Sequence, residues 1–392
     1  MNKKKHKAIY AVLCVLIMTI TAIGRFVYIN RSNNATHNSK STAEDDVRMS
    51  GEYGYTTTGS RLKISQLEQT VKNYSSFIST IEKGLKFNIP GLENTFIGKD
   101  CSSMVPQGIC IAEDYFITTA YDASGENGSV LYLTNATTKL LECVIELPLK
   151  IHAGGIAFDG EKLWICADDE YRDSSNLGII YSIAFEKIKQ LNNQDNLYAF
   201  VDLVDMEKSY INNSASFCTY FNNRLWVGTF TKHSNKDSTF GCMMSYDVND
   251  FEELEGAKQL KHESFLVLPN RSQGVCFFEM QGNTYMALSR SYTRSKHYGK
   301  SAYISEMRVY LPLFDPDNSA KILKKGIALA KIETPPMIEE ICYNDLDGML
   351  YAIFESGASK YSTDNTQSFM RCKYIFDKIA AINPEKIIKS EN

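Results

Sequence analysis

Polar side chains stand directly before five short apolar segments of this 392-residue chain. Aligned by these segments, the outermost position holds Val105, His152, Asn213, Arg271 and Met337. The next two positions hold Gln107, Gly154, Ala215, Gln273 and Glu339, and then Gly108, Gly155, Ser216, Gly274 and Glu340. Imidazole, amide, guanidinium and carboxylate groups brought together can bind a small polar ligand, a sugar or a metal ion.

The sequence contains none of the familiar nucleophile or zinc motifs. It has no GxSxG, no HExxH and no CxxC, and these spacings mark a nucleophile elbow, a zinc protease helix and a thiol or zinc site. A glycosidase would need two carboxylates across a cleft, for which Asp122, Asp168, Asp169 and Glu340 are candidates. The basic, aromatic stretch 290–300 is a further candidate, either for binding an anionic polymer or as a solvated loop.

The elements that must position these side chains are repeated. Each apolar segment begins a strand, a tight turn and an aromatic-rich second strand: 106–117, 152–165, 214–227, 272–286 and 339–351. A four-stranded propeller blade occupies about 40 to 50 residues, and these units recur at similar or somewhat longer intervals. The pattern predicts an all-β fold, a β-propeller of about five blades. A sixth blade could lie in 183–212 or 311–332, and 94–100 could add the closing outer strand.

A propeller brings the starts of its innermost strands together around one channel mouth. We therefore expect a ligand-binding site at this mouth, made by His152, Asn213, Arg271, Gln273 and Glu340. The open alternative is that these side chains only hydrate the channel or satisfy loop backbone groups.

The run His152-Ala-Gly-Gly-Ile156, followed by Leu163-Trp-Ile-Cys-Ala-Asp168, is the most blade-like stretch. With the other repeats it resembles the NHL-like and regucalcin-like β-propellers, over residues 94–389. Regucalcin-like lactonases hold a divalent cation through Glu, Asn and Asp from different blades. The resemblance implies Glu340, Asn213 and Asp168 as the corresponding metal ligands, and oxygen ligands of this kind suit calcium or magnesium. The expected cofactor is none, with Ca²⁺ as the alternative. The family motif itself is not matched.

Four of the ten cysteines, Cys110, Cys218, Cys276 and Cys342, occupy one repeat position, which Ala157 fills in the second unit. A position that accepts Cys and Ala favours a small, packed side chain. Cys101, Cys143, Cys166, Cys242 and Cys372 could include one or two disulfides, but the sequence does not assign pairs.

The N-terminal residues 1–29 predict a signal anchor. Lys3, Lys4, Lys5 and Lys7 precede an uncharged apolar run from Ala8 to Gly24, and positive charge on one flank keeps that flank in the cytoplasm. The alternative is a signal peptide cleaved near Gly24, which would release the protein. Residues 30–60 are polar and predict a flexible stalk.

Residues 61–85 predict an amphipathic helix, because apolar residues recur there at steps of three and four. The helix could lie against the domain at 94–389 or form a short coiled coil that makes an oligomer.

The formal net charge of −4 gives no reason to expect nucleic-acid binding. The sequence thus predicts a membrane-tethered, extracellular propeller that binds a ligand, or a protein or glycan partner, at the cell surface. The alternative is an extracellular hydrolase of the lactonase type with a divalent cation at the channel mouth.

Overall fold

The computed structural model describes residues 70–92, 95, 101–167, 177–192, 197–231, 241–254, 256–291, 305–311, 328–362, 372 and 374–389. The predicted anchor at 1–29 and the stalk at 30–60 lie outside this set. Within the described residues, no helix combines the length and the apolar character needed to cross a membrane.

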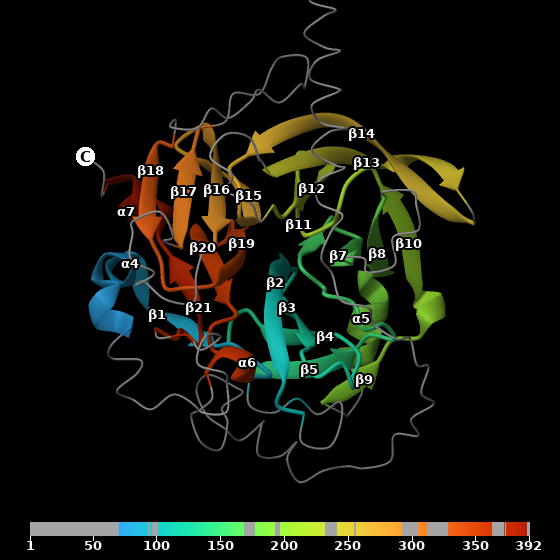
Figure 1. Cartoon of the computed structure of the whole chain (residues 1–392), viewed down its shortest axis with the longest axis horizontal. Helices are drawn as coiled ribbons and strands as arrows, with labels where there is room; N and C mark the ends of the chain where they lie inside the picture. The colour runs from blue at the N-terminus through green and yellow to red at the C-terminus, as the bar shows by residue number, and fades with distance from the viewer. Residues whose placement is uncertain are drawn as a thin grey trace, which may run out of the picture.

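Most described residues lie in strands, which form five four-stranded antiparallel units (Figure 1). The first unit contains β2 (Met104–Ala112), β3 (Tyr115–Asp122), β4 (Val130–Asn135) and β5 (Leu141–Glu146). The second contains β6 (Ile156–Phe158), β7 (Lys162–Ala167), β8 (Gly178–Ala184) and β10 (Met206–Ile211). The third contains β11 (Phe217–Phe221), β12 (Arg224–Thr229), β13 (Gly241–Leu254) and β14 (Ala257–Leu268). The fourth contains β15 (Ser272–Met280), β16 (Asn283–Arg290), β17 (Glu306–Tyr310) and β18 (Ala330–Glu333). The fifth contains β19 (Ile338–Asn344), β20 (Met349–Phe354), β21 (Lys378–Ile382) and β1 (Ile81–Asn88).

The first strands of the five units form a closed ring at the centre. Strand β2 contacts β6, β6 contacts β11, β11 contacts β15, β15 contacts β19, and β19 contacts β2. Figure 1 shows the units arranged around this centre. The expected all-β, propeller-like architecture is confirmed.

The apolar residues of the repeats fill the spaces between units. Ile109, Ile156, Phe217, Val275 and Ile341, the residues used to align the repeats, are at most 1% exposed. The tight turns between first and second strands use residues that tolerate a left-handed backbone, such as Asn222 at φ 51° and Asn223 at φ 56°.

The ring closes through the N-terminal strand β1. It is the outer strand of the fifth unit and pairs with β21, with Phe87 opposite Ile379. We had expected 94–100 in this role; Thr95 instead bridges to Cys101. A segment before the first unit does supply the closing strand, as predicted, but that segment is β1 rather than 94–100.

The same strand corrects the predicted helix at 61–85. Residues 70–73 and helix α4 (Ser75–Thr80) are helical, as predicted, but α4 ends where β1 begins, so the segment from Ile81 onward is strand. Pairing with β21 and burial of Ile81 and Phe87, at 8% and 1% exposure, decide this structure. Tertiary contacts of this kind override a local helical period. Residues 61–69 of the predicted helix lie outside the described set.

The region 183–212, where a sixth blade was allowed, holds an insertion instead. Helix α5 (Phe185–Asn192), strand β9 (Tyr198–Phe200) and the short 3-10 helix η1 (Leu203–Asp205) stand between β8 and β10. Strand β9 adds to β5 of the first unit in parallel. Two more short helices, α6 (Ser359–Ser362) and α7 (Pro384–Lys389), follow β20 and β21.

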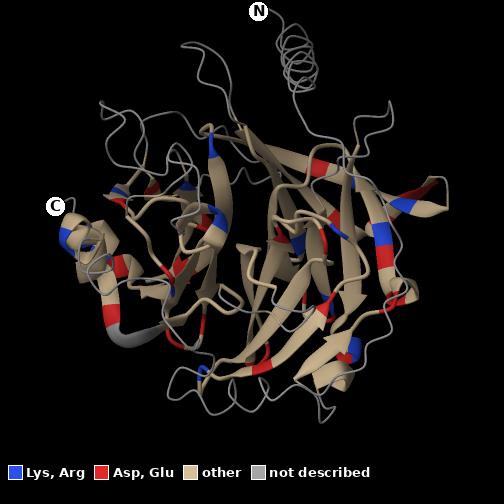
Figure 2. Ribbon diagram, turned by 60° about the horizontal axis from the view of Figure 1, so that its bottom comes forward, with Lys and Arg blue, Asp and Glu red and all other residues tan. Residues whose placement is uncertain are grey.

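A long hairpin joins the second and third units into one sheet. The distal part of β13 and β14 extends past its own unit, and β14 pairs in parallel with β10 at Ser209 and Lys258. Charged residues of both signs are scattered over the units (Figure 2).

Candidate functional site

One end of the ring, which we call the mouth, carries the starts of the five innermost strands. The antiparallel order within each unit also places the ends of the five second strands and the starts of the five third strands there. The turns at the opposite end, between first and second strands, are 113–114, 159–161, 222–223, 281–282 and 345–348. Functional residues are disproportionately carried on long connections held by a rigid scaffold, so the mouth is the end to examine.

The backbone is unusual at three of the strand starts. Ala153, Arg271 and Met337 have φ values of 51°, 62° and 65°, a left-handed region that non-glycine residues seldom occupy. The register with the second strand also shifts near the starts of β15 and β19. Such strain costs on the order of 1–3 kcal/mol per residue and clusters at functional sites.

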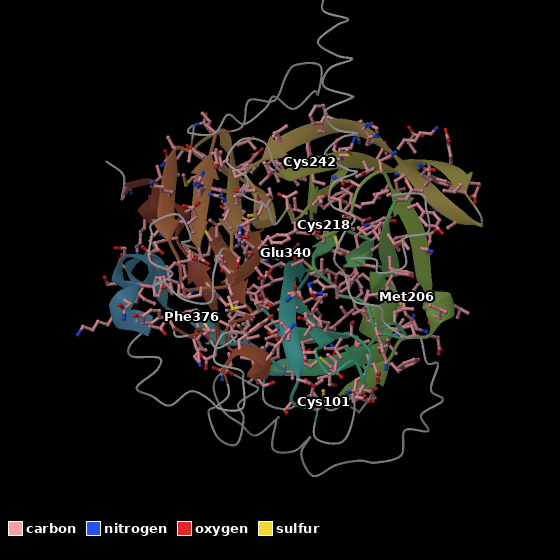
Figure 3. The ribbon with its side chains drawn as sticks, in the orientation of Figure 1. Cys101, Met206, Cys218, Cys242, Glu340 and Phe376 are labelled. Carbon is pink, nitrogen blue, oxygen red and sulfur yellow. The ribbon has the colours of Figure 1, made fainter. Side chains whose placement is uncertain are left out.

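Glu340 lies at the centre of the ring, as Figure 3 shows. Its side chain is buried, and its carboxylate accepts hydrogen bonds from backbone N–H groups of three other units. Oε2 accepts from Ile109 at 2.8 Å and Ile156 at 2.9 Å, and Oε1 accepts from Cys218 at 3.2 Å. Burial raises the pKa of Glu340, while the three N–H donors favour the ionised form.

Small residues in the other units make room for this carboxylate. A Cβ added at Gly155 would lie 2.7 Å from Glu340 Oε1, and one at Gly274 would lie 2.6 Å from Glu340 Cα. The position of Glu340 is occupied elsewhere by Gly108, Gly155, Ser216 and Gly274. We expected Glu340 to face the mouth; the structure instead places it inside, where it joins the innermost strands.

The preceding position, Glu339, builds the floor of the mouth. Glu339 is 3% exposed, and its Oε1 accepts a hydrogen bond from Gln273 Nε2 at 3.0 Å. Its carboxyl group is also hydrogen-bonded to that of Glu355. Glu355 Oε2 in turn accepts a hydrogen bond from Gln107 Nε2 at 3.3 Å. Burial, and then the neighbouring Glu355, raise the pKa of Glu339 well above its usual value. We call Gln107, Gln273, Glu339 and Glu355 the floor cluster.

The first unit provides an aromatic rim beside this floor. The ring of Tyr121 packs against exposed His152 with centroids 4.5 Å apart, and Lys360 Nζ donates to Tyr121 Oη at 2.9 Å. Tyr121 is the last residue but one of β3 and lies opposite Val105, and Lys360 lies in α6 after Glu355. Side chains from the first, second and fifth units therefore meet at one side of the mouth.

The other two predicted ligand-binding residues are placed differently. The side chain of Arg271 is partly exposed at the start of the fourth unit, and its backbone N–H donates to Thr231 O at 3.0 Å. Asn213 is 8% exposed, and its amide contacts Cys242 Sγ at 2.9 Å and the backbone N–H of Ser214 at 3.0 Å. Asn213 thus bonds within the third unit.

The described residues do not bring together the predicted metal ligands Glu340, Asn213 and Asp168. Asp168 lies outside the described residues, and Glu340 and Asn213 use their polar atoms in the contacts given above. Within the described part of the chain, no three His, Cys, Asp or Glu side chains come together as a metal site. The Ca²⁺ expectation stays a prediction.

Sequence reasoning did not single out Glu355, Tyr121 or Lys360. The available signal was their position: Tyr121 and Glu355 stand at or just after the ends of second strands, which run toward the mouth. The carboxyl contact between Glu339 and Glu355 depends on how β19 and β20 pair, with Ile338 opposite Phe354. The register of β19 and β20 shifts between Ile338 and Ile341. Nothing in the sequence predicts this shift.

A shallow depression of about 320 Å³ lies at the opposite end, lined by Glu113, Gly160, Glu161, Lys162, Ala184, Phe185 and Glu186. Two of its carboxylates form ion pairs with Lys189: the distance from Lys189 Nζ is 3.1 Å to Glu113 Oε1 and 2.5 Å to Glu186 Oε1. It lacks the buried, convergent polar groups of the mouth.

No protein-family model and no curated protein matches the sequence. The glutaminyl cyclase of Myxococcus xanthus is similar in structure at 9% identity, with a TM-score of 0.36, over 72% of this chain and 90% of that chain. A glucose dehydrogenase is similar at 10% identity, with a TM-score of 0.35, over 72% and 83%. A GH43_1 enzyme from Xanthomonas citri is similar at 10% identity, with a TM-score of 0.33, over 56% and 72%. At these scores the likenesses carry no argument about function, and the description of this chain as propeller-like stands on its strand pairing.

Proposed function

We propose that this protein is a membrane-tethered, extracellular five-bladed β-propeller that binds a small polar ligand at the mouth. The lysines before the apolar run 8–24 support the tether and the outward orientation of the remainder. All five second strands end at the mouth and all five third strands begin there, which supports the mouth as the binding end.

The floor cluster is the observation that carries the ligand site. It holds two amides and two carboxyl groups that come from three units and contact one another. The adjacent Glu340 lies at the centre of the ring, where its carboxylate is hydrogen-bonded to backbone N–H groups of three other units. A hydroxyl-rich ligand offers both donors and acceptors, which matches this mixture of groups. We therefore propose a sugar as the ligand.

The proposal is tested by calorimetric titration of the full chain with a panel of neutral, amino and acidic monosaccharides. Loss of a hydrogen bond to a buried polar group costs roughly 1–3 kcal/mol, so Gln273→Ala and Glu355→Gln should each weaken binding by about 10-fold or more. Gln259→Ala in β14 and Glu279→Gln in β15 are matched controls away from the mouth and should bind like the parent. A panel in which no sugar binds, or in which the mouth variants match the controls, would reject the sugar site.

Hydrolysis is a second candidate, favoured by the contact between Glu339 and Glu355. Two hydrogen-bonded carboxyl groups hold one proton between them, because like charges so close cannot both ionise readily. Glycosidase carboxylates stand about 5 to 9.5 Å apart, so a directly bonded pair does not fit that chemistry. A shared proton suits water attack on a carbonyl: one carboxylate accepts the proton of water, and the other carboxyl donates to the carbonyl oxygen. The substrate class would then be an ester or lactone.

Assays with aryl esters and simple lactones separate the two candidates. If the pair is catalytic, Glu339→Gln and Glu355→Gln should each lower kcat by about 100-fold or more, with Glu279→Gln unchanged. Sugar binding without any turnover of these substrates would reject hydrolysis and support the binding function.

A further inference from the structure

A basic side chain is held in a defined position at the aromatic rim of the mouth. Lys360 Nζ donates a hydrogen bond to Tyr121 Oη at 2.9 Å, and it lies 5.3 and 5.4 Å from the ring centroids of Tyr121 and Tyr361. A phenol oxygen and two aromatic rings orient an ammonium group without neutralising its charge. The exposed His152 covers the ring of Tyr121, with centroids 4.5 Å apart, and so holds the phenol in place.

The backbone that carries Lys360 is anchored as well. Helix α6 is tied to the segment before β2 by Ser359 Oγ, which donates to Ser102 O at 2.6 Å. Tyr361, the next residue after Lys360, is 5% exposed, whereas Lys360 itself is partly exposed. A side chain held in this way loses little conformational freedom when it binds a ligand, which favours affinity.

The rim and the floor cluster are neighbours. Tyr121 pairs with Val105 in β2, the strand that also carries Gln107 of the floor cluster. Lys360 follows Glu355, another member of the floor cluster, by five residues. Two residues along a strand span about 7 Å, so one sugar can contact the rim and the floor cluster together.

The acidic side chains on this side of the mouth are engaged with neutral donors. Asp122, the residue after Tyr121, is 4% exposed, and both its oxygens accept hydrogen bonds from its own loop, residues 124–127. The two carboxyl groups of the floor cluster accept hydrogen bonds from its two amides. Lys360 thus supplies a positive charge at the rim, where it favours an anionic group on the ligand.

We propose that the sugar bound at the mouth is an acidic one, whose carboxylate pairs with Lys360 while its hydroxyl groups bond to the floor cluster. This inference rests on the sugar site proposed above and adds the charge of the ligand to it. An ammonium group has three donor protons, so a ligand carboxylate can accept one while Tyr121 Oη accepts another. Charge-assisted hydrogen bonds are about twice as strong as neutral ones, which makes Lys360 a specificity-determining residue.

Calorimetric titration of the full chain tests the proposal with sugars that differ only by a carboxylate in place of a hydroxymethyl group. Glucose is compared with glucuronate, and galactose with galacturonate. The uronate of at least one pair should bind about 10-fold or more tightly than its neutral partner. Its affinity should fall as salt is added, whereas that of the neutral sugar should change little.

The possible failures are distinguishable. Neutral sugars that bind as tightly as their uronates would overturn the acidic ligand and leave the sugar site standing. If no sugar of either kind binds, the sugar site itself is rejected, and the acidic ligand with it.

Variants assign the preference to a residue. Lys360→Met keeps much of the aliphatic chain and removes the charge, so it should lower uronate affinity far more than the affinity of the neutral partner. Lys331→Met, at an exposed position of β18 in the outer part of the fourth unit, removes the same charge elsewhere and should bind like the parent. Tyr121→Phe removes the oxygen that orients the ammonium group and should reduce the preference only in part.

The thermal midpoint of Lys360→Met shows whether this variant is folded, and we expect a value close to that of Lys331→Met. Equal uronate affinities of these two variants would overturn the role of Lys360.

Discussion

Glu340 shows how one side chain can hold several repeats together. Its carboxylate bonds to backbone N–H groups of the first, second and third units while belonging to the fifth. Glycines at the matching positions of three other units let the strands approach it. A buried carboxylate is expensive unless it is fully hydrogen-bonded, and here three donors offset that cost.

Substitution of Glu340 should therefore cost stability rather than only ligand affinity. Glu340→Ala leaves three buried N–H groups without their acceptor and should lower the free energy of unfolding by about 3–5 kcal/mol. Glu340→Gln keeps one carbonyl acceptor and should cost less, about 1–3 kcal/mol. Denaturant titration checks this order, with Glu279→Gln as the exposed control. A Glu340→Ala variant as stable as the parent would contradict the role assigned to the carboxylate.

Glu339, the adjacent residue, differs from Glu340 in its hydrogen-bond partners. Successive side chains of a strand point to opposite faces, yet the irregular pairing between Ile338 and Ile341 lets both acids lie near the axis. One is then bonded by backbone groups and the other by side chains of the floor cluster. The two acids should accordingly be separable, since changes at Glu355 or Gln273 should alter ligand handling with a smaller effect on stability.

At the scale of elements, β1 is the segment on which closure of the ring depends. It covers the outer edge of β21, and without it the fifth unit would expose unpaired backbone groups. Phe87 is 1% exposed and packs against Phe116 of the first unit at 5.2 Å between ring centroids. The strand therefore also connects the last unit to the first.

Phe87→Ala should destabilise the fold strongly. Removal of a fully buried phenylalanine side chain costs about 3–5 kcal/mol through lost burial and the cavity left behind. Phe200→Ala in β9 is the matched control, because Phe200 is 40% exposed and should cost little. Thermal or denaturant unfolding measures both, and equal effects at the two positions would argue against closure through β1.

At the scale of the whole molecule, the ligand site at the mouth and the membrane tether are two separate proposals. The mouth rests on the arrangement of the five units, whereas the tether rests on residues 1–29, which lie outside the described structure. Their tests are accordingly independent.

We expect the C-terminus to lie outside the cytoplasm. A reporter active only outside, fused after Asn392, should give signal, and a reporter active only inside should not. Replacing the lysines before residue 8 with glutamate is the control, because loss of the positive flank should weaken this orientation. Signal only from the cytoplasmic reporter would rule out the tethered, extracellular form.

The sequence by itself determined the repeating strand pattern and the end of the ring that carries the polar positions. This was possible because side-chain alternation and tight turns are local properties. The apolar residues at Ile109, Ile156, Phe217, Val275 and Ile341 had to be buried wherever the units were placed, and they are.

Only the tertiary structure decided which acid is buried inside, which belongs to the floor cluster, and where the ring closes. Glu339 and Glu340 are neighbours of identical chemistry, and they differ only in the donors that other units bring to them. Glu355 became part of the floor through the pairing of β19 with β20, and Ile81 entered a strand because β21 offered an unpaired edge. Each of these outcomes depends on contacts between residues far apart in the chain, which local pattern and propensity do not encode.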